Sequence, residues 1–161
     1  MTPAALAAAA ALALGPVQPG GHIGAMTVDR GRLEDAQQEF FAYCDPFVST
    51  AGVHHRTCRV PRVKLLFIGY GSYDKTLREL NSEWRREKWY CWLDGRRIGL
   101  LPFGAYDRQI QLGRKPPGTT VTLREWQVML IGVTPGRHML RYLSRTRDGV
   151  VTDTTWTFTV D

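Results

Sequence analysis

The sequence predicts a mainly β fold built as two layered antiparallel sheets. In its last segment Trp156, Phe158 and Val160 share one face and threonines occupy the other, as in a half-buried strand. Turn dipeptides such as Asp148-Gly149 separate this segment from similar runs before it. Five Trp, six Tyr and six Phe in 161 residues are enough to fill the space between two sheets. The length suits one domain with attachments rather than two domains.

Residues 1–20 have the character of an export signal. The apolar run from Ala4 to Leu14 is too short to span a bilayer and matches the hydrophobic region of a secretory signal peptide. Ala11 and Ala13 supply a small-residue cleavage pattern. Because no Lys or Arg precedes the run, the alternatives are a true start further upstream, a weak signal, or the Ala-rich tail of a cytoplasmic protein. We expect a secreted or cell-envelope protein without a transmembrane helix.

Residues 21–60 are expected to form an N-terminal extension with a short helix and a cysteine-bounded loop. The segment 33–43 places apolar residues at helical spacing with acids in its first turn, which predicts the helix. Cys44 and Cys58 are separated by 13 residues, and in an exported protein they predict a disulfide that stabilises by about 3 kcal/mol. Cys91 is left over inside an aromatic strand, where a buried thiol behaves as a small hydrophobic side chain.

The β-sandwich domain is expected over residues 61–161. Strands are predicted where apolar or alternating runs are bounded by Gly, Pro or Asp-Gly turns. The predicted strands are 63–69, 89–94, 96–101, 120–133, 138–144 and 150–160, with 108–112 as an optional seventh. Residues 73–88 are ambiguous. Leu77, Leu80 and Trp84 have the spacing of an amphipathic helix, but the last residues also suit the start of the next strand.

The C-terminal part of the chain resembles a known kind of module. The resemblance rests on WYCWLDGRR and TPGRHMLRYLSRTRDGVVTDTTWTFTVD, which look like the end of an immunoglobulin-like or fibronectin-like module of bacterial extracellular proteins. It covers roughly residues 60–161 and implies an immunoglobulin-like sandwich of two antiparallel sheets. It carries no catalytic motif, and such sandwiches serve many unrelated functions. The long segments 69–88 and 102–118 depart from the usual seven-strand pattern.

The net charge of +6 is concentrated in the middle of the chain. From Arg56 to Arg97 there are eleven cations and five acids, which gives +6, whereas residues 1–28 contain no Asp, Glu, Lys or Arg. A solvated basic face explains this pattern most simply. The alternative is a surface for an acidic polymer, anionic lipid or nucleic acid, with nucleic acid favoured only if the N-terminal run is not a signal.

The candidate ligand-binding residues are Trp84, Arg85, Arg86, Arg96 and Arg97. Aromatic and cationic side chains alternate here, and on paired strands some of them would share a surface able to grip a polyanion or stack on sugar rings. The competing interpretation places the tryptophans in the core with the cations around them.

The remaining chemistry-bearing residues form no comparable pattern. His54, His55 and Cys58 lack a second ligand pair at zinc-finger spacing, so we expect no metal and no cofactor. His138 is expected to be hydrogen-bonded at a sheet edge, because no nucleophile motif accompanies it. The glycines of GYGS at 69–72 lack the ending of a phosphate loop and indicate a turn.

These patterns favour a binding or structural module over an enzyme. The leading hypothesis is an exported β-sandwich protein whose partner is an anionic cell-envelope polymer or another protein. The first alternative is a small secreted enzyme or enzyme inhibitor that uses residues 69–88. The second is a basic cytoplasmic protein associated with nucleic acid.

Overall fold

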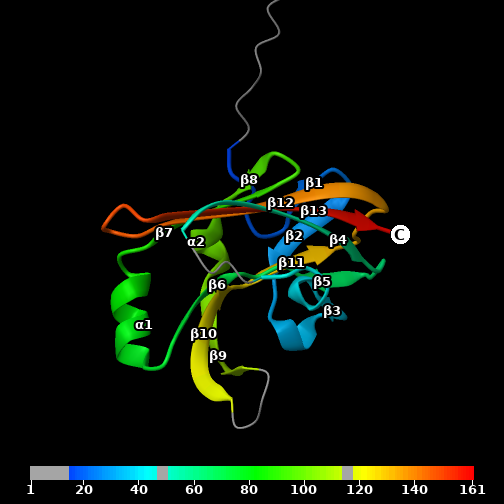
Figure 1. The fold of residues 1–161 in the computed structure, drawn as a ribbon. Helices are drawn as coiled ribbons and strands as arrows, with labels where there is room; N and C mark the ends of the chain where they lie inside the picture. The colour runs from blue at the N-terminus through cyan, green and yellow to red at the C-terminus, as the bar shows by residue number, and fades with distance from the viewer. Residues whose placement is uncertain (1–14, 47–50, 114–117) are drawn as a thin grey trace, which may run out of the picture.

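The computed structural model describes residues 15–46, 51–113 and 118–161 as a mainly β chain (Figure 1). The apolar run predicted as a signal, from Ala4 to Leu14, lies outside these residues. Within them, no helix has the length and apolar character needed to cross a membrane.

Sheet A has five strands in the order β4-β13-β12-β7-β8. Its strands are β4 (Gly52–Val60), β7 (Lys88–Leu93), β8 (Arg96–Ile98), β12 (Gly136–Arg145) and β13 (Val151–Val160). The β12–β13 and β7–β8 pairs are antiparallel neighbours in sequence, whereas β4 joins β13 in parallel.

Two further sheets, B and C, are joined by one continuous stretch of chain. Sheet B contains β1 (Gly21–Ile23), β2 (Met26–Arg30), β3 (Gln38–Glu39), β5 (Leu65–Phe67) and β11 (Val128–Ile131). Sheet C contains β6 (Gly71–Asp74), β9 (Ala105–Leu112) and β10 (Thr119–Trp126). Because only Gln127 separates β10 from β11, the chain passes directly from sheet C into sheet B.

Sheet A lies over sheet B (Figure 1). The side chains between them form one apolar core. From sheet A come the inward residues Cys91, Leu93, Leu140, Tyr142, Trp156 and Phe158, all at most 1% exposed. From sheet B come Val28, Leu66, Val128 and Leu130, which are fully buried. The hydroxyl of Tyr142 donates to the carbonyl of Ile68 at 3.1 Å, so the two layers also share a buried hydrogen bond.

The prediction of a mainly β chain is confirmed, and the expectation that all strand pairs are antiparallel is wrong at two places. At the predicted hairpin between β7 and β8, Asp94 and Gly95 have φ of 49° and 77°, as a tight two-residue turn requires. The parallel pairs are β4 with β13 and β3 with β5. Long connections join these partners, so no tight turn imposes an antiparallel direction on them.

The helix predicted over residues 33–43 is wrong. Two short 3-10 turns, η1 (Leu33–Asp35) and η2 (Phe40–Ala42), flank the extended strand β3 there. The backbone of Gln37 donates to Leu65 at 3.0 Å, and its side-chain oxygen accepts from the amide of Lys64 at 2.6 Å. These contacts with the chain around β5 satisfy polar groups that a helix would have used internally.

The ambiguous stretch before β7 forms helix α1 (Leu77–Trp84). Thr76 is its N-cap and accepts from the amide of Glu79 at 3.2 Å, which satisfies one free donor of the first turn. The predicted strand 96–101 ends at Ile98. Helix α2 (Leu100–Phe103) follows, because it buries Leu100 and Phe103 against the core.

Candidate ligand-binding surfaces

Three of the five predicted ligand-binding residues lie in one groove. Trp84 and Arg85 at the end of α1 and Arg97 on β8 line a groove of about 530 Å³, which we call the basic groove. Arg86 lies instead in a depression on α1. Arg96 pairs in register with buried Leu93, so it lies on the opposite side of β8 from Arg97.

The tryptophans of the basic groove are also packing residues. The ring centroid of Trp84 is 5.6 Å from that of Trp89 and 5.0 Å from that of Trp126. Within the described residues, the indole N–H groups of Trp89 and Trp126 are buried without a hydrogen-bond partner of good geometry. The rings are half-buried or buried, as the packing interpretation requires, and they also line an open groove. Ligand binding at this groove stays a prediction.

An arginine–aromatic ladder continues from the basic groove across the outer surface of sheet A. We define it as Tyr90, Trp92, Arg97 and Arg141, which come from β7, β8 and β12. The guanidinium carbon of Arg97 lies 5.2 Å from the ring centroid of Tyr90, and that of Arg141 lies 4.8 Å from the ring centroid of Trp92. The two rings stack on each other, with centroids 6.1 Å apart and planes at 21°.

Asp153 on β13 fixes one end of the ladder. Its carboxylate accepts two hydrogen bonds from the guanidinium of Arg141, at 2.8 and 2.6 Å. The hydrogen bonds to Arg141 hold the pKa of Asp153 below its usual value. Asp153 is only 9% exposed, so this pair orients Arg141 over Trp92.

Further cations extend the outer surface beyond the ladder. Arg137, Arg141 and Arg145 alternate with buried residues of β12, so they point outward about 13 Å apart along the strand. Lys88 lies opposite Arg145 in the neighbouring strand. Among the described residues, no carboxylate pairs with Lys88, Arg97, Arg137 or Arg145. Four uncompensated positive charges therefore share one face.

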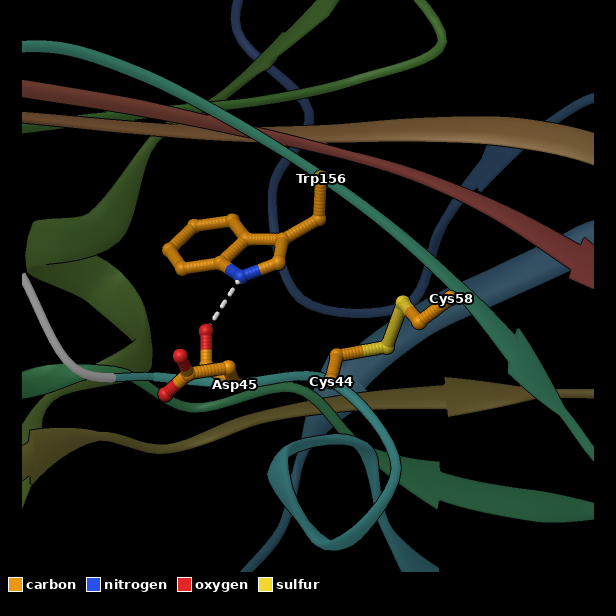
Figure 2. The surroundings of a disulfide bond; sticks show 4 residues. All are labelled: Cys44, Asp45, Cys58 and Trp156. Carbon is orange, nitrogen blue, oxygen red and sulfur yellow. Dashed lines mark hydrogen bonds between the residues drawn. A yellow bond between two sulfur atoms is a disulfide. The ribbon is translucent and has the colours of Figure 1, made fainter.

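The predicted disulfide between Cys44 and Cys58 is confirmed (Figure 2). It joins the segment after η2 to the inward side of β4. The next residue, Asp45, accepts a hydrogen bond at its backbone carbonyl from the indole N–H of Trp156, at 2.8 Å. The disulfide therefore holds a segment that also contacts the centre of the core. Cys91 is a free, fully buried thiol.

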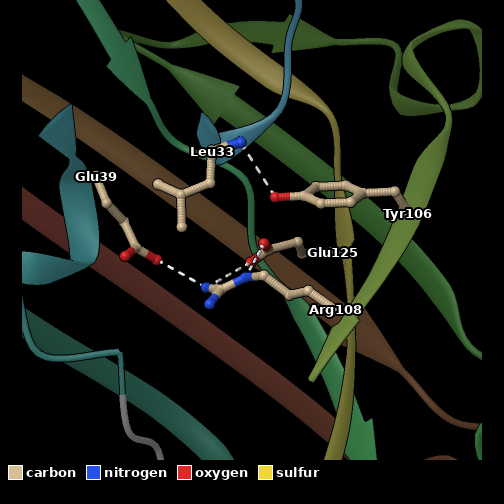
Figure 3. Close-up of polar contacts among 5 residues, drawn as sticks. All are labelled: Leu33, Glu39, Tyr106, Arg108 and Glu125. Atoms are coloured by element: carbon tan, nitrogen blue, oxygen red, sulfur yellow. Dashed lines mark hydrogen bonds and ion pairs between the residues drawn. The ribbon is translucent and has the colours of Figure 1, made fainter. Parts of the chain in front are cut away.

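A separate cleft of about 360 Å³ opens between sheet C and the inward side of sheet A. Across it, Arg108 on β9 donates to Glu125 on β10 at 2.6 Å and to Glu39 on β3 at 3.0 Å (Figure 3). Nearby, the hydroxyl of Tyr106 accepts from the amide of Leu33 at 3.1 Å (Figure 3). The carboxylate of Glu125 is almost completely buried, and burial raises its pKa although Arg108 opposes the effect.

Comparison of the chain with protein-family models, curated proteins and solved structures gives no match.

Glu87, between α1 and β7, is the other notable carboxylate of this cleft. It is half-buried and accepts a hydrogen bond from the hydroxyl of Ser72 at 3.0 Å. Burial raises its pKa, the hydroxyls of Ser144 and Ser72 oppose the shift, and the like charge of Glu83 adds to it. The negative charge of Glu87 therefore costs folding free energy.

Glu87→Gln is expected to raise the free energy of unfolding near neutral pH. A carboxyl whose folded-state pKa is raised binds more protons in the folded state, so its charge destabilises the fold above that pKa. The gain should shrink as the pH falls through the folded-state pKa and vanish below the unfolded-state value of 4.5. Urea unfolding of both proteins at pH 7.5 and pH 4 measures this. A Gln variant that is equally destabilised at both pH values would contradict it.

The histidine and glycine residues that the sequence did not favour as functional have structural roles. His138 is 8% exposed, and its ring nitrogens contact Asp94 Oδ2 at 2.8 Å and the carbonyl oxygen of Thr134 at 2.9 Å, which confirms its hydrogen-bonded position. A Cβ at Gly71 would overlap the carbonyl oxygen of Arg124, so this glycine allows β6 and β10 to approach closely. No group of three His, Cys, Asp or Glu side chains able to hold a metal occurs in the described part of the chain.

Sequence reasoning missed most of the ladder, although a signal was present. In WYCWL the buried residues are Cys91 and Leu93, so strand alternation places Tyr90 and Trp92 outward. The same alternation places Arg137, Arg141 and Arg145 on one side of β12. Proximity in sequence does not reveal this surface, because it is built from strands that are distant in sequence.

Proposed function

We propose that the protein is an exported, immunoglobulin-like β-sandwich module that binds an extended anionic polymer on the outer surface of sheet A. The observation that carries the proposal is the ladder, in which Arg97, Tyr90, Trp92 and Arg141 form one stack over three strands. Exposed cations on either side of it lack carboxylate partners among the described residues. A guanidinium held against an aromatic ring suits recognition of anionic groups.

The spacing of the charges favours a polymer over a small anion. From Arg137 to Arg145 the outward arginines of β12 extend over about 26 Å, and the basic groove continues the surface past β8. A single small anion would contact only one or two of these side chains. A chain of repeated anionic groups could contact several of these side chains at once. At low salt, the positive potential of the surface would also attract such a chain.

Export is supported by the disulfide and by the apolar N-terminal run of the sequence. Disulfides such as Cys44–Cys58 persist in oxidising compartments and are rare in the cytosol. Mass analysis of the protein from its native host tests this part. We expect a shortened N-terminus and oxidised Cys44 and Cys58, and an intact N-terminus with both thiols reduced would contradict export.

Polymer binding is tested with dextran sulfate and a pair of double variants of equal net charge. Arg97→Ala with Arg145→Ala removes two exposed cations of the proposed surface, whereas Arg78→Ala with Arg86→Ala removes two exposed arginines in α1 and just after it. We expect weaker binding by the first variant only. The slope of log Kd against log salt should fall in magnitude by about 2 for it, since each removed cation displaces about one counterion fewer.

Three outcomes would overturn the proposal. The first is that the wild-type protein does not bind dextran sulfate, or binds uncharged dextran equally well. The second is that both double variants weaken binding to the same extent, because then net charge rather than the ladder surface is responsible. The third is tighter binding of duplex DNA than of dextran sulfate at the same salt concentration, which would favour a nucleic-acid partner.

A further inference from the structure

The cleft beside sheet C differs in charge from the basic groove, although Glu87 and Trp89 line both. Its walls come from the segment around β6, from β9 and β10, and from the inward ends of β7, β12 and β13. Its volume of about 360 Å³ is within the range of small-molecule sites. Residues of the long 69–88 insertion, among them Tyr70, Ser72 and Glu87, form much of its lining.

The cleft is acidic although the chain is basic. The charged lining side chains are Arg108 and four carboxylates, Glu39, Glu83, Glu87 and Glu125. Arg108 is already bonded to Glu125 and Glu39 (Figure 3). In a protein with a net charge of +6, the cleft therefore keeps an excess of negative charge that the described chain does not neutralise.

Glu87 is the carboxylate most in need of a counterion. It is half-buried and bonded to the Ser72 hydroxyl, but it forms no ion pair with any described residue. The indole N–H of Trp89, which makes no hydrogen bond of good geometry, lies near enough to help hold its negative charge. A carboxylate withdrawn from water without a cationic partner is costly, so Glu87 favours a ligand that brings a positive group into the cleft.

Aromatic side chains surround the space next to this carboxylate. Phe41, Tyr70 and Trp89 line the cleft, and the ring centroid of Tyr70 lies 5.2 Å from that of Phe41 and 6.1 Å from that of Trp89. The Tyr70 hydroxyl donates to the carbonyl of Pro46 at 3.1 Å, which fixes the ring. Aromatic walls beside a carboxylate favour an organic cation, because the rings attract the charge and cover an aliphatic stem.

We propose that this cleft binds an organic cation, an ammonium or guanidinium group on an aliphatic stem, with Glu87 as its counterion and Phe41, Tyr70 and Trp89 around the stem. A neutral sugar would also suit the aromatic walls, but it would leave the charge of Glu87 uncompensated. The ligand of this site has the opposite charge to the polymer proposed for sheet A, so the two proposals can fail separately. The site gives a binding role to the insertion that interrupts the β pattern.

The test compares three probes that differ at the end of one side chain: the Nα-acetyl methylamides of lysine, arginine and norleucine. Calorimetric titration at low salt should give a Kd for the lysine or the arginine probe about tenfold or more below that for norleucine, as expected for a charge-assisted hydrogen bond. The tighter of the two cations identifies the preferred group. Chemical-shift changes of the Trp89 indole N–H should accompany binding.

The decisive variant is Glu87→Gln, with Glu34→Gln as the matched control. Glu34 is an exposed carboxylate in η1 that does not line the cleft, so its loss changes net charge equally. Glu87→Gln should abolish the preference for cations, and Glu34→Gln should preserve it. Equal binding of norleucine and the cations, or an unchanged preference in Glu87→Gln, would overturn the proposal. A wild-type protein that does not bind dextran sulfate would overturn the proposed polymer binding but not this cation site.

Discussion

Removing the disulfide by Cys44→Ala with Cys58→Ala is expected to lower the free energy of unfolding by about 3 kcal/mol, the cost of freeing a loop of this length in the unfolded chain. In a chain of this size such a loss lowers Tm by roughly 6–12 °C. The folded state should suffer as well, because the disulfide holds the segment whose Asp45 carbonyl accepts from Trp156. Urea unfolding followed by tryptophan fluorescence measures the change.

A reducing agent provides the internal control for this prediction. It should destabilise the wild-type protein and Cys91→Ala, which both keep the disulfide, and leave Cys44→Ala with Cys58→Ala unchanged. If the oxidised and reduced wild-type proteins unfold at the same urea concentration, the disulfide contributes nothing to stability. In that case its value as a sign of an exported protein would remain, but its structural role would be contradicted.

Patterns among adjacent residues were enough to predict most strands. Features that depend on contacts between distant segments could not be predicted from the sequence. The alternation of Trp156, Phe158 and Val160 and the Asp94-Gly95 turn are properties of adjacent residues, and both were interpreted correctly. The segment around Gln37 failed as a helix because its bonds go to Lys64 and Leu65, which helical periodicity does not reveal. Propensity yields to tertiary contacts of this kind.

The same limit applies to the parallel strand pair and to the candidate sites. The pairing of β4 with β13 closes a loop of about a hundred residues, and no turn motif in the sequence indicates it. The basic groove was partly foreseen because Trp84, Arg85 and Arg97 are close in sequence. The cleft was not, since Glu39, Glu87 and Glu125 come from three distant segments and only the fold brings them together.

Breaking the buried ion pair of the cleft should have the other large effect. Arg108→Met leaves Glu125, 2% exposed, without its cationic partner, and the expected loss of unfolding free energy is about 3 kcal/mol. The value lies at the lower end for buried pairs because the Arg108 side chain is 28% exposed and water can reach the site. Urea unfolding at pH 7.5 measures the loss.

The pH dependence identifies the unpaired carboxylate as the cause of this loss. Burial already raises the pKa of Glu125 and Arg108 opposes the shift, so without Arg108 the folded-state pKa rises further. Because the folded state then holds the proton more tightly than the unfolded state, the destabilisation should be fully present at high pH and decrease as the pH falls through that raised pKa. Arg108→Met with Glu125→Gln should recover much of the loss at pH 7.5, since it removes the buried charge itself. A loss that is the same at pH 7.5 and pH 5, and that the second substitution does not relieve, would mean that Arg108 stabilises sheet C through packing of its aliphatic stem.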